Sequence, residues 1–367
     1  MRQQTSVWRY FDVWLTTAVL LLTAYGILII RSAITNTPAF VGYETRQIQF
    51  TILSMVVMLV VAAIDYRIFT SGHWYVYFGL IGLLTLVLLI GGARNNVVGW
   101  IELGPLSFQP AELGRITIPI SLGAFLTSRA DKIGNFSNTI WSLVYMGLPI
   151  GLVFIQPDLG MTIVYIVVWF GIIMIAGLPL RHFFILLFMG TLLIGIAYPN
   201  LADYQRVRIT SFIDPDSDPE QSRNVTQAVI SVGTGGWWGK GYFQGTQSQL
   251  GFLRVQHTDF IFAVLTEEMG FFFGSLVVVG LMGFILLRIL RIASITPDPA
   301  GRYICVGIAT TLFFQVIVSV GMNTRLMPVT GLTFPFVSYG GSSLLTLYIG
   351  IGVVQSVLMR HRKQEFG

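Results

Sequence analysis

The chain has 367 residues, of which 11% are charged and 54% are apolar or aromatic (Ala, Val, Ile, Leu, Met, Phe, Trp, Tyr and Cys). Soluble domains carry about a quarter charged residues because water must solvate their surface, so this composition excludes a water-soluble protein of this size. The net charge of +5 does not indicate nucleic-acid binding, because the basic residues are spread between apolar segments along the whole chain.

Apolar segments long enough to cross a bilayer recur along the chain. A spanning helix needs about 20 mostly apolar residues, because the hydrocarbon core is roughly 30 Å thick. About ten segments meet this requirement, at Val13–Ala33, Gln49–Ile64, Trp74–Gly91, Ala111–Thr127, Thr139–Ile155, Leu159–Ala176, Phe183–Pro199, Phe260–Leu290, Arg302–Met322 and Gly341–Met359. The sequence therefore predicts an all-α integral membrane protein, with residues 1–367 forming one polytopic domain.

The distribution of Lys and Arg predicts the orientation in the membrane. One set of loops and ends carries Arg2, Arg9, Arg67, Arg129, Lys132, Arg181, Arg288, Arg291, Arg302, Arg360, Arg362 and Lys363. The opposite set carries far fewer, chiefly Arg46, Arg94 and Arg325. The positive-inside rule then places both termini in the cytoplasm and a loop from Asn200 to Thr258, between spans seven and eight, outside it. A loop of that length is typical of a functional segment rather than a simple connection.

Ionisable side chains near membrane depth mark either a functional site or a buried pair. Glu112 and Arg115 are three residues apart on one expected helix, so they share a face and can pair. Structural neutralisation and substrate binding explain that pair equally well. Asp158 lies between two expected spans after Pro157, where a helix N-cap and a functional role are both open.

The expected outer loop offers several kinds of chemistry. Arg206 and Arg208 place two guanidinium groups close together. The acidic run of residues 214–220 lacks the glycine and the terminal bidentate carboxylate of an EF-hand, so we predict no metal site there. Glycines around Lys240 would let the backbone approach phosphate oxygens, with the lysine as a point charge. A glycine-rich segment at the membrane interface, with two tryptophans at headgroup level, explains the same residues structurally.

Asp259 lies where the polar loop becomes an apolar helix. Partial desolvation there is expected to raise the pKa of its carboxyl group and to make it a better proton acceptor at neutral pH. An aspartate near a helix start also serves as an N-cap, and the residues alone leave both roles open. Glu267 and Glu268 lie deeper on the same expected helix, and because neighbouring residues point about 100° apart, at most one of them faces the same polar interior as Asp259.

A series of motifs covers nearly the whole chain. The motifs are Phe108-Gln109-Pro110-Ala111-Glu112-Leu113, Gln156-Pro157-Asp158-Leu159-Gly160, Gly239-Lys240-Gly241, Gly245-Thr246-Gln247-Ser248-Gln249-Leu250, residues 257–264 with Glu267-Glu268, residues 328–331 and residues 335–343. In this order and at these intervals they resemble the SEDS family (shape, elongation, division and sporulation). The sequence of residues 246–250 resembles that of the RodA branch of the family.

The resemblance implies a peptidoglycan glycosyltransferase that polymerises lipid II into glycan strands outside the bacterial cytoplasmic membrane, for cell-wall elongation and rod shape. It also implies that Asp259 is the catalytic residue, and a carboxylate near the attacking sugar hydroxyl can act as general base. Cations near the pyrophosphate would offset its developing charge. The substrate-binding residues that we expect are Arg206, Arg208, Lys240, Arg115, Glu112, Asp158, Gln249, His257 and Ser338.

The expected partners follow from the same resemblance. They are lipid II, the undecaprenyl-pyrophosphate glycan strand, the surrounding membrane lipids and a class B penicillin-binding protein, which is a transpeptidase; no nucleic acid is expected. No metal ligand and no cofactor is predicted with certainty, and a divalent cation, Mg or Mn, is an open alternative. The chain departs from the family at three places: Gly99 replaces a common Arg, Arg115 replaces a common Lys, and Arg254-Val255 replaces a common Pro-Glu. These departures bear on the charge pattern around the substrate.

Other classes of function fit the sequence less well. A lipid II flippase would use the same cations but needs a polar path across the full bilayer, and the inner halves of the expected spans carry few ionisable residues. A secondary transporter would show related halves with broken helices, and no such repeat is evident. A non-catalytic scaffold of the cell-wall elongation machinery remains an alternative, but it leaves Asp259 without a role.

Overall fold

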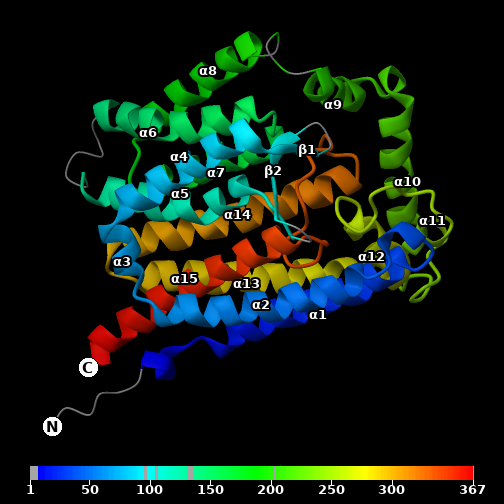
Figure 1. The fold of residues 1–367 in the computed structure, drawn as a ribbon, viewed down its shortest axis with the longest axis horizontal. Helices are drawn as coiled ribbons and strands as arrows, with labels where there is room; N and C mark the ends of the chain where they lie inside the picture. The colour runs from blue at the N-terminus through cyan, green and yellow to red at the C-terminus, as the bar shows by residue number, and fades with distance from the viewer. Residues whose placement is uncertain are drawn as a thin grey trace.

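Helices that run roughly along one long axis make up most of the computed structural model of the chain (Figure 1). The structure describes residues 7–94, 97–103, 106–129, 136–197, 199, 201 and 203–366. The α-helices are α1 (Val13–Ile34), α2 (Tyr43–Ala63), α3 (Tyr66–Ser71), α4 (His73–Ile90), α5 (Pro110–Thr127), α6 (Phe136–Ile155), α7 (Leu159–Ile175), α8 (Leu180–Ala197), α9 (Asp203–Ile213), α10 (Pro219–Gly235), α11 (Thr246–Gln249), α12 (Ile261–Met269), α13 (Val277–Ile295), α14 (Pro299–Asn323) and α15 (Gly341–Phe366). Short 3₁₀ turns span Val7–Tyr10, Pro38–Phe40 and Pro215–Ser217, and a π-helical segment, Gly270–Leu276, joins α12 to α13.

Each expected span coincides with a helix of the structure. Among the described residues, seven helices are long and apolar enough to cross a membrane, at Val13–Ile34, Tyr43–Ala63, His73–Ile90, Phe136–Ile155, Ile261–Ile295, Pro299–Asn323 and Gly341–His361. The remaining expected spans correspond to α5, to the shorter apolar helix α7 and to α8, whose expected range continues past Ala197 into a residue outside the described part. The prediction of an α-helical, multi-pass membrane protein is thus confirmed, and the number of spans stays a prediction.

Several helices begin at an aspartate that caps them. The Asp12 carboxylate accepts a hydrogen bond from the Leu15 N–H of α1 at 3.0 Å. The Asp298 carboxylate accepts hydrogen bonds from the Ala300 and Gly301 N–H groups of α14, which has Pro299 at its first position. A side-chain oxygen at this position satisfies an N–H group that has no partner within the helix, and proline there loses nothing by lacking an N–H. Polar caps therefore define where these apolar helices start.

Two regions contain elements that the search for apolar spans did not predict. The connection between α4 and α5 forms a small antiparallel sheet of β1 (Gly92–Arg94), β2 (Val97–Leu103) and β3 (Leu106–Phe108). In this sheet Arg94 pairs with Val97 and Ile101 pairs with Phe108. The expected loop, whose first residue Asn200 lies outside the described residues, contains α9, α10 and α11. These helices are polar and the strands are short, so neither gives a continuous apolar run.

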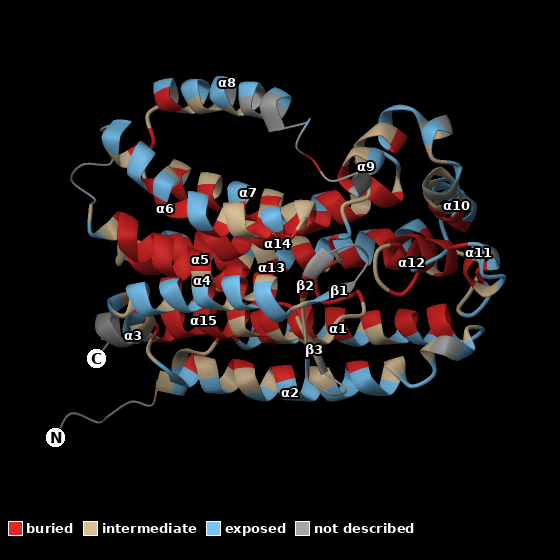
Figure 2. Ribbon diagram, turned by 45° about the horizontal axis from the view of Figure 1, so that its top comes forward, coloured by how far each residue is buried: buried red, intermediate tan, exposed pale blue. Residues whose placement is uncertain are grey.

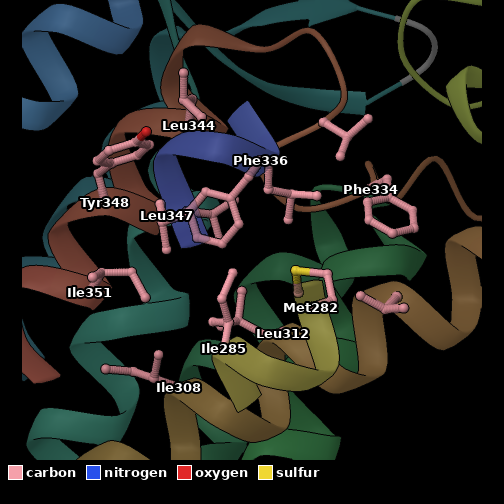
Figure 3. Close-up of a cluster of buried hydrophobic side chains, with 14 of the residues drawn as sticks. Met282, Ile285, Ile308, Leu312, Phe334, Phe336, Leu344, Leu347, Tyr348 and Ile351 are labelled. Atoms are coloured by element: carbon pink, nitrogen blue, oxygen red, sulfur yellow. The ribbon is translucent and has the colours of Figure 1, made fainter. Parts of the chain in front are cut away.

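The core of the bundle lies where α13, α14 and α15 meet the segment that precedes α15. Figure 3 shows Met282 and Ile285 of α13 facing Leu312 of α14, with Phe334 and Phe336 above them. Figure 2 shows α5, α14 and α15 as largely buried helices, whereas α2 and α4 present exposed faces. Exposed apolar faces are expected for helices in contact with lipid, where association depends on close packing rather than on the hydrophobic effect.

The two ends of the bundle differ. Figures 1 and 2 show the chain termini at one end of the long axis and α9, α10 and α11 at the other. The connection from α14 to α15 lies toward the second end, and α12 begins there (Figure 1). Asp259, just before α12, therefore belongs to the end of the bundle opposite the termini.

Candidate functional site

The backbone around Asp259 is held by the α14–α15 junction, which we define as residues 323–340. Three successive carbonyl groups, those of residues 257–259, accept hydrogen bonds from this junction. The Tyr339 N–H donates to the first carbonyl at 2.9 Å, the Ser338 hydroxyl to the second at 2.7 Å and the Asn323 amide to the third at 3.0 Å. Each donor holds one peptide group, so the junction fixes the main chain on both sides of the Asp259 side chain.

Asn323 also caps α12. Its side-chain oxygen accepts the Ala263 N–H at 3.0 Å, and its amide also donates to the Ser319 carbonyl at 2.7 Å. The residue at the N-cap position of α12 is Phe260, which has no side-chain cap. The start of α12 is thus satisfied by a side chain from α14 and not by Asp259, and the proton-acceptor role of Asp259 stays a prediction.

The Asp259 carboxyl group is half-buried and lies in the field of Arg208. Burial raises the pKa of Asp259 above its ordinary value, whereas the positive charge of Arg208 and a hydrogen bond from Thr258 oppose that rise. Arg208 reaches the same junction, because its Nη1 donates to the Thr330 carbonyl at 2.9 Å. The α14–α15 junction therefore holds the Arg208 side chain close enough for its charge to act on the expected catalytic carboxylate.

Asp158 is the second carboxyl group beside Arg208. It is the N-cap of α7, as one of its two expected roles required, and accepts the Met161 N–H at 2.9 Å. Its other oxygen accepts the Gln109 side-chain amide at 2.8 Å. Burial raises the pKa of Asp158, against these hydrogen bonds and the charges of Arg208 and Arg115. Arg208 thus acts on both Asp158 and Asp259, which the sequence separates by a hundred residues.

Glu112 and Arg115 form the ion pair that their spacing predicted. Arg115 is almost fully buried, and its Nη2 also donates to the Ser343 hydroxyl of α15 at 2.9 Å. The Nε and Nη1 groups of Arg115 have no acceptor among the described residues. A guanidinium with spare donors can take part in anion binding or can tie α5 to α15, so its role in substrate binding stays a prediction.

Lys240 lies in a network of its own. Its ammonium group donates to Glu267 at 2.8 Å, and also to Thr246 at 2.7 Å and Thr234 at 3.0 Å. The Glu267 side chain is fully buried and also accepts the Gln247 N–H at 3.0 Å. These contacts give Lys240 a structural role in joining α10, α11 and α12, and binding of substrate by Lys240 stays a prediction.

Gln249 and Glu268 form a second network beside the first. The Gln249 amide donates to the Ser32 hydroxyl at 3.1 Å and to Glu268 at 3.3 Å, and Ser32 donates to Glu268 at 2.5 Å. Asn36 donates to the Gln249 side chain at 2.9 Å. Glu267 and Glu268 therefore serve two separate networks, and neither is in hydrogen-bond contact with Asp259.

Arg206 and His257 occupy different surroundings from Arg208. The Arg206 guanidinium donates to the Pro199 carbonyl, which ties the start of α9 to the chain that precedes it. The His257 ring is buried against Phe40, with centroids 4.3 Å apart, and against Tyr43 and Tyr339. His257 and Ser338 thus support the Asp259 backbone, and direct contact with substrate remains a prediction for both.

Sequence reasoning missed Asn323, Gln109 and Thr330 as parts of this site. Asn323 ends a long apolar run and is completely buried, and a buried amide at such a position was a detectable signal. Thr330 acts through its backbone carbonyl, which carries no side-chain signal. Among the described residues, no group of three or more His, Cys, Asp or Glu side chains is placed to hold a metal ion.

A carboxylate held by its main chain in the field of an arginine, at one end of a bundle of membrane helices, is a candidate active site in a polytopic membrane protein. Comparisons with known proteins agree with this class. The family of cell cycle proteins that comprises FtsW, RodA and SpoVE matches residues 12–363. The chain belongs to this family, as its motifs indicated.

Relatives and solved structures support the assignment. The chain is 36% identical to peptidoglycan glycosyltransferase MrdB of Escherichia coli (strain K12), over 96% of this chain and 95% of the relative. It is 33% identical to stage V sporulation protein E of Bacillus subtilis (strain 168), over 94% and 96%. A chain solved in a study of how a peptidoglycan synthase complex coordinates polymerization and crosslinking matches with a TM-score of 0.84 at 31% identity, over 97% of this chain and 99% of that one. The rod shape determining protein RodA of Thermus thermophilus matches with a TM-score of 0.72 at 29% identity, over 97% and 98%.

Proposed function

We propose that this protein is a peptidoglycan glycosyltransferase that polymerises lipid II, with Asp259 as the general base. Its membership of the family and its likeness to MrdB support the class of reaction. The observation that supports the residue assignment is the fixed position of Asp259: the α14–α15 junction holds its main chain, and its carboxylate lies in the field of Arg208. A general base is most effective when it is held in place and its pKa lies near the working pH, and both the fixed main chain and the burial that raises the pKa of Asp259 support this role.

In the proposed reaction, a sugar hydroxyl of one substrate attacks the anomeric carbon of the other. A new carbon–oxygen bond forms, and the bond from that carbon to the pyrophosphate oxygen breaks with its electron pair going to the lipid pyrophosphate. Asp259 accepts the hydroxyl proton as the bond forms. Attack from the face opposite the leaving group inverts an α-linked donor into a β-linked product without a covalent enzyme intermediate.

Arg208 is the cation best placed to assist this step. It is the arginine whose charge acts on both Asp158 and Asp259, and Thr330 fixes its position. A preorganised guanidinium can offset negative charge as it develops on the pyrophosphate. Arg115 has unused donors nearby in the Asp158 region and is a second candidate for the same role.

The decisive experiment is Asp259→Asn, measured as polymerisation of purified lipid II by the protein with its transpeptidase partner. Asn keeps the size of the side chain and removes the base, so the rate should fall by about 10² to 10⁴. Asp298→Asn is the matched control, because Asp298 caps the other end of α14 and Asn is equally good as an N-cap. A folded Asp259→Asn protein that polymerises at the wild-type rate would eliminate the assignment, and the melting temperature of each preparation shows whether it is folded.

The membrane setting completes the proposal. We infer that the termini face the cytoplasm, that the end with α9, α10, α11 and Asp259 faces outward, and that the membrane is the bacterial cytoplasmic membrane. The Lys and Arg distribution and the position of the termini opposite α9–α11 support this orientation (Figure 1). Cysteines introduced at Ser217 and Gln364 should react with a thiol reagent from opposite sides of the membrane in intact cells. The native Cys305 should not react, because it is buried.

We also propose a class B penicillin-binding protein as partner, because a solved structure similar to this chain comes from a peptidoglycan synthase complex. For a divalent cation, the described residues offer few ligands around Asp259. Mg²⁺ is commonly held by one or two carboxylates together with substrate phosphates. We therefore expect the pyrophosphate of the substrate to supply most ligands of any Mg²⁺ or Mn²⁺ that is required, with Asp158 as a further carboxylate within the field of Arg208.

A further inference from the structure

A hollow lies at the end of the bundle that carries the chain termini, opposite the end that carries Asp259. It is formed by residues 9–14, around the start of α1, by the last turns of α13, and by Leu358 of α15. Its cavity volume is about 280 Å³. Three arginines line it, Arg9, Arg288 and Arg291, together with a single carboxylate, Asp12. None of these residues takes part in the site around Asp259.

The floor of the hollow is built from fixed polar groups. Arg288 donates from Nε at 2.9 Å and from Nη2 at 2.5 Å to one oxygen of the buried Asp12 carboxylate. The Gln355 side chain of α15 accepts the Asp12 N–H at 2.9 Å and donates to the Asp12 carbonyl at 2.8 Å. Asp12 also caps α1, so α1, α13 and α15 meet at this residue. The hollow therefore has a rigid base that does not depend on a ligand.

The charges around this base do not cancel. Asp12 neutralises Arg288, and neither Arg9 nor Arg291 has an ion pair or a side-chain hydrogen bond among the described residues. Three arginines against one aspartate leave two positive charges facing the same hollow. A guanidinium group offers paired N–H donors in one plane, which match two oxygens of a phosphate group.

The surroundings place the hollow at the level of lipid headgroups. Trp14 lines it and is 70% exposed, and Trp8 is exposed nearby on the turn that leads into α1. Tryptophan is enriched where the apolar core of a bilayer meets water. Leu287, which precedes Arg288, and Leu290, which precedes Arg291, are exposed as well and give acyl chains an apolar surface on α13.

We propose that this hollow binds the phosphodiester headgroup of an anionic phospholipid, with Arg9 and Arg291 as the phosphate ligands and the acyl chains against α13. Basic pockets between helices on the cytoplasmic side are the sites where anionic headgroups bind membrane proteins. The two uncompensated arginines select a net negative headgroup over a zwitterionic one, because a zwitterion brings its own cation into the hollow. The proposal does not depend on the role of Asp259, and only the assignment to the inner leaflet rests on the proposed orientation.

The test is a lipid titration of the whole purified chain in neutral detergent, read by native mass spectrometry. The probes are dioleoyl-phosphatidylglycerol, dioleoyl-phosphatidylcholine and inorganic phosphate. The wild type should bind phosphatidylglycerol more tightly than phosphatidylcholine. The double variant Arg9→Gln/Arg291→Gln should lose at least about tenfold in affinity for phosphatidylglycerol, which is about 1.4 kcal/mol. Arg181→Gln is the matched control, since it removes an exposed arginine on α8, outside the hollow, and should bind like the wild type.

Each outcome decides the question. Loss of phosphatidylglycerol binding in the double variant alone supports the site. Equal binding of the two lipids, or equal loss in Arg181→Gln, would show attraction to overall positive charge and would overturn it. Displacement of phosphatidylglycerol by inorganic phosphate at millimolar concentration would identify a free-phosphate site and would also overturn the lipid assignment. Because binding is read on intact protein and not through activity, failure here leaves the proposed function untouched.

Discussion

The side-chain amide of Asn323, at the end of α14, donates a hydrogen bond of 3.0 Å to the backbone carbonyl of Asp259. The same side chain accepts the Ala263 N–H at the start of α12. One buried amide therefore fixes both the residue that we propose as the base and the helix that follows it. This makes Asn323 a positioning residue, because it acts on the reaction through Asp259.

The first prediction concerns Asn323→Asp. Aspartate can still accept the Ala263 N–H but cannot donate to the Asp259 carbonyl, and it adds a like charge near the Asp259 carboxylate. We expect kcat to fall by at least about tenfold with little change in KM, since a displaced base lowers the rate of the chemical step. We also expect the acid limb of the pH profile to move to higher pH, because a nearby negative charge raises the pKa of Asp259.

The added charge alone can move the acid limb, so the fall in kcat is the part of this prediction that tests the lost hydrogen bond to Asp259. The control is Gln315→Leu, which alters another buried amide of α14 about two turns earlier. Gln315→Leu should leave both kcat and the pH profile of the folded protein near wild type. If Asn323→Asp behaved like Gln315→Leu, Asn323 would have no positioning role.

The second prediction separates Arg208 from Arg206, which the sequence could not distinguish. Arg208 acts on the carboxyl groups of Asp158 and Asp259, whereas Arg206 contacts the Pro199 carbonyl. Arg208→Ala should lower turnover by about 10² or more, the typical loss when a preorganised stabilising group is removed. Arg206→Ala should stay within a few-fold of wild type. Equal losses in the two variants, measured by lipid II polymerisation, would show that Arg208 has no special place in the site.

The third prediction concerns the Lys240–Glu267 pair. Lys240→Met leaves the fully buried Glu267 carboxylate without its cation, and breaking such a pair costs about 3–5 kcal/mol; we expect the lower end because Lys240 is 25% exposed. Lys240→Met/Glu267→Gln should recover part of that loss, because it removes the unpaired charge. Unfolding of both variants in detergent measures the difference. An increase in KM without loss of stability would instead assign Lys240 to the substrate.

The sequence predicted the helices of this fold well and its site only in part. Apolar runs identify spanning helices because lipid demands them, and α1 begins at Val13 as expected. The spacing of Glu112 and Arg115 predicted their pairing, because residues three apart share one face of a helix. Contacts between distant segments, such as Arg208 with Thr330, depend on tertiary packing that no local pattern encodes. Lys240 and Arg208 are both basic residues of the segment between α8 and α12, and only the structure shows that Lys240 has a glutamate partner while the charge of Arg208 acts on Asp259.

The last prediction concerns the pH dependence of the reaction. Burial raises the pKa of Asp259, and a base must be deprotonated to accept a proton. The value of kcat/KM should therefore fall as the pH is lowered through a pKa that lies above the ordinary value of about 3.9. Arg208 lowers the pKa of Asp259 by its charge, so Arg208→Gln should move this acid limb to higher pH. Arg208→Lys keeps the charge and should leave the limb close to its wild-type position even if turnover falls. The profiles are measured as initial rates of lipid II polymerisation between acid and neutral pH, with folding checked at each pH. An acid limb that is the same in Arg208→Gln and in wild type would mean that the titrating group is not the carboxylate beside Arg208, and the assignment of Asp259 as the base would have to be abandoned.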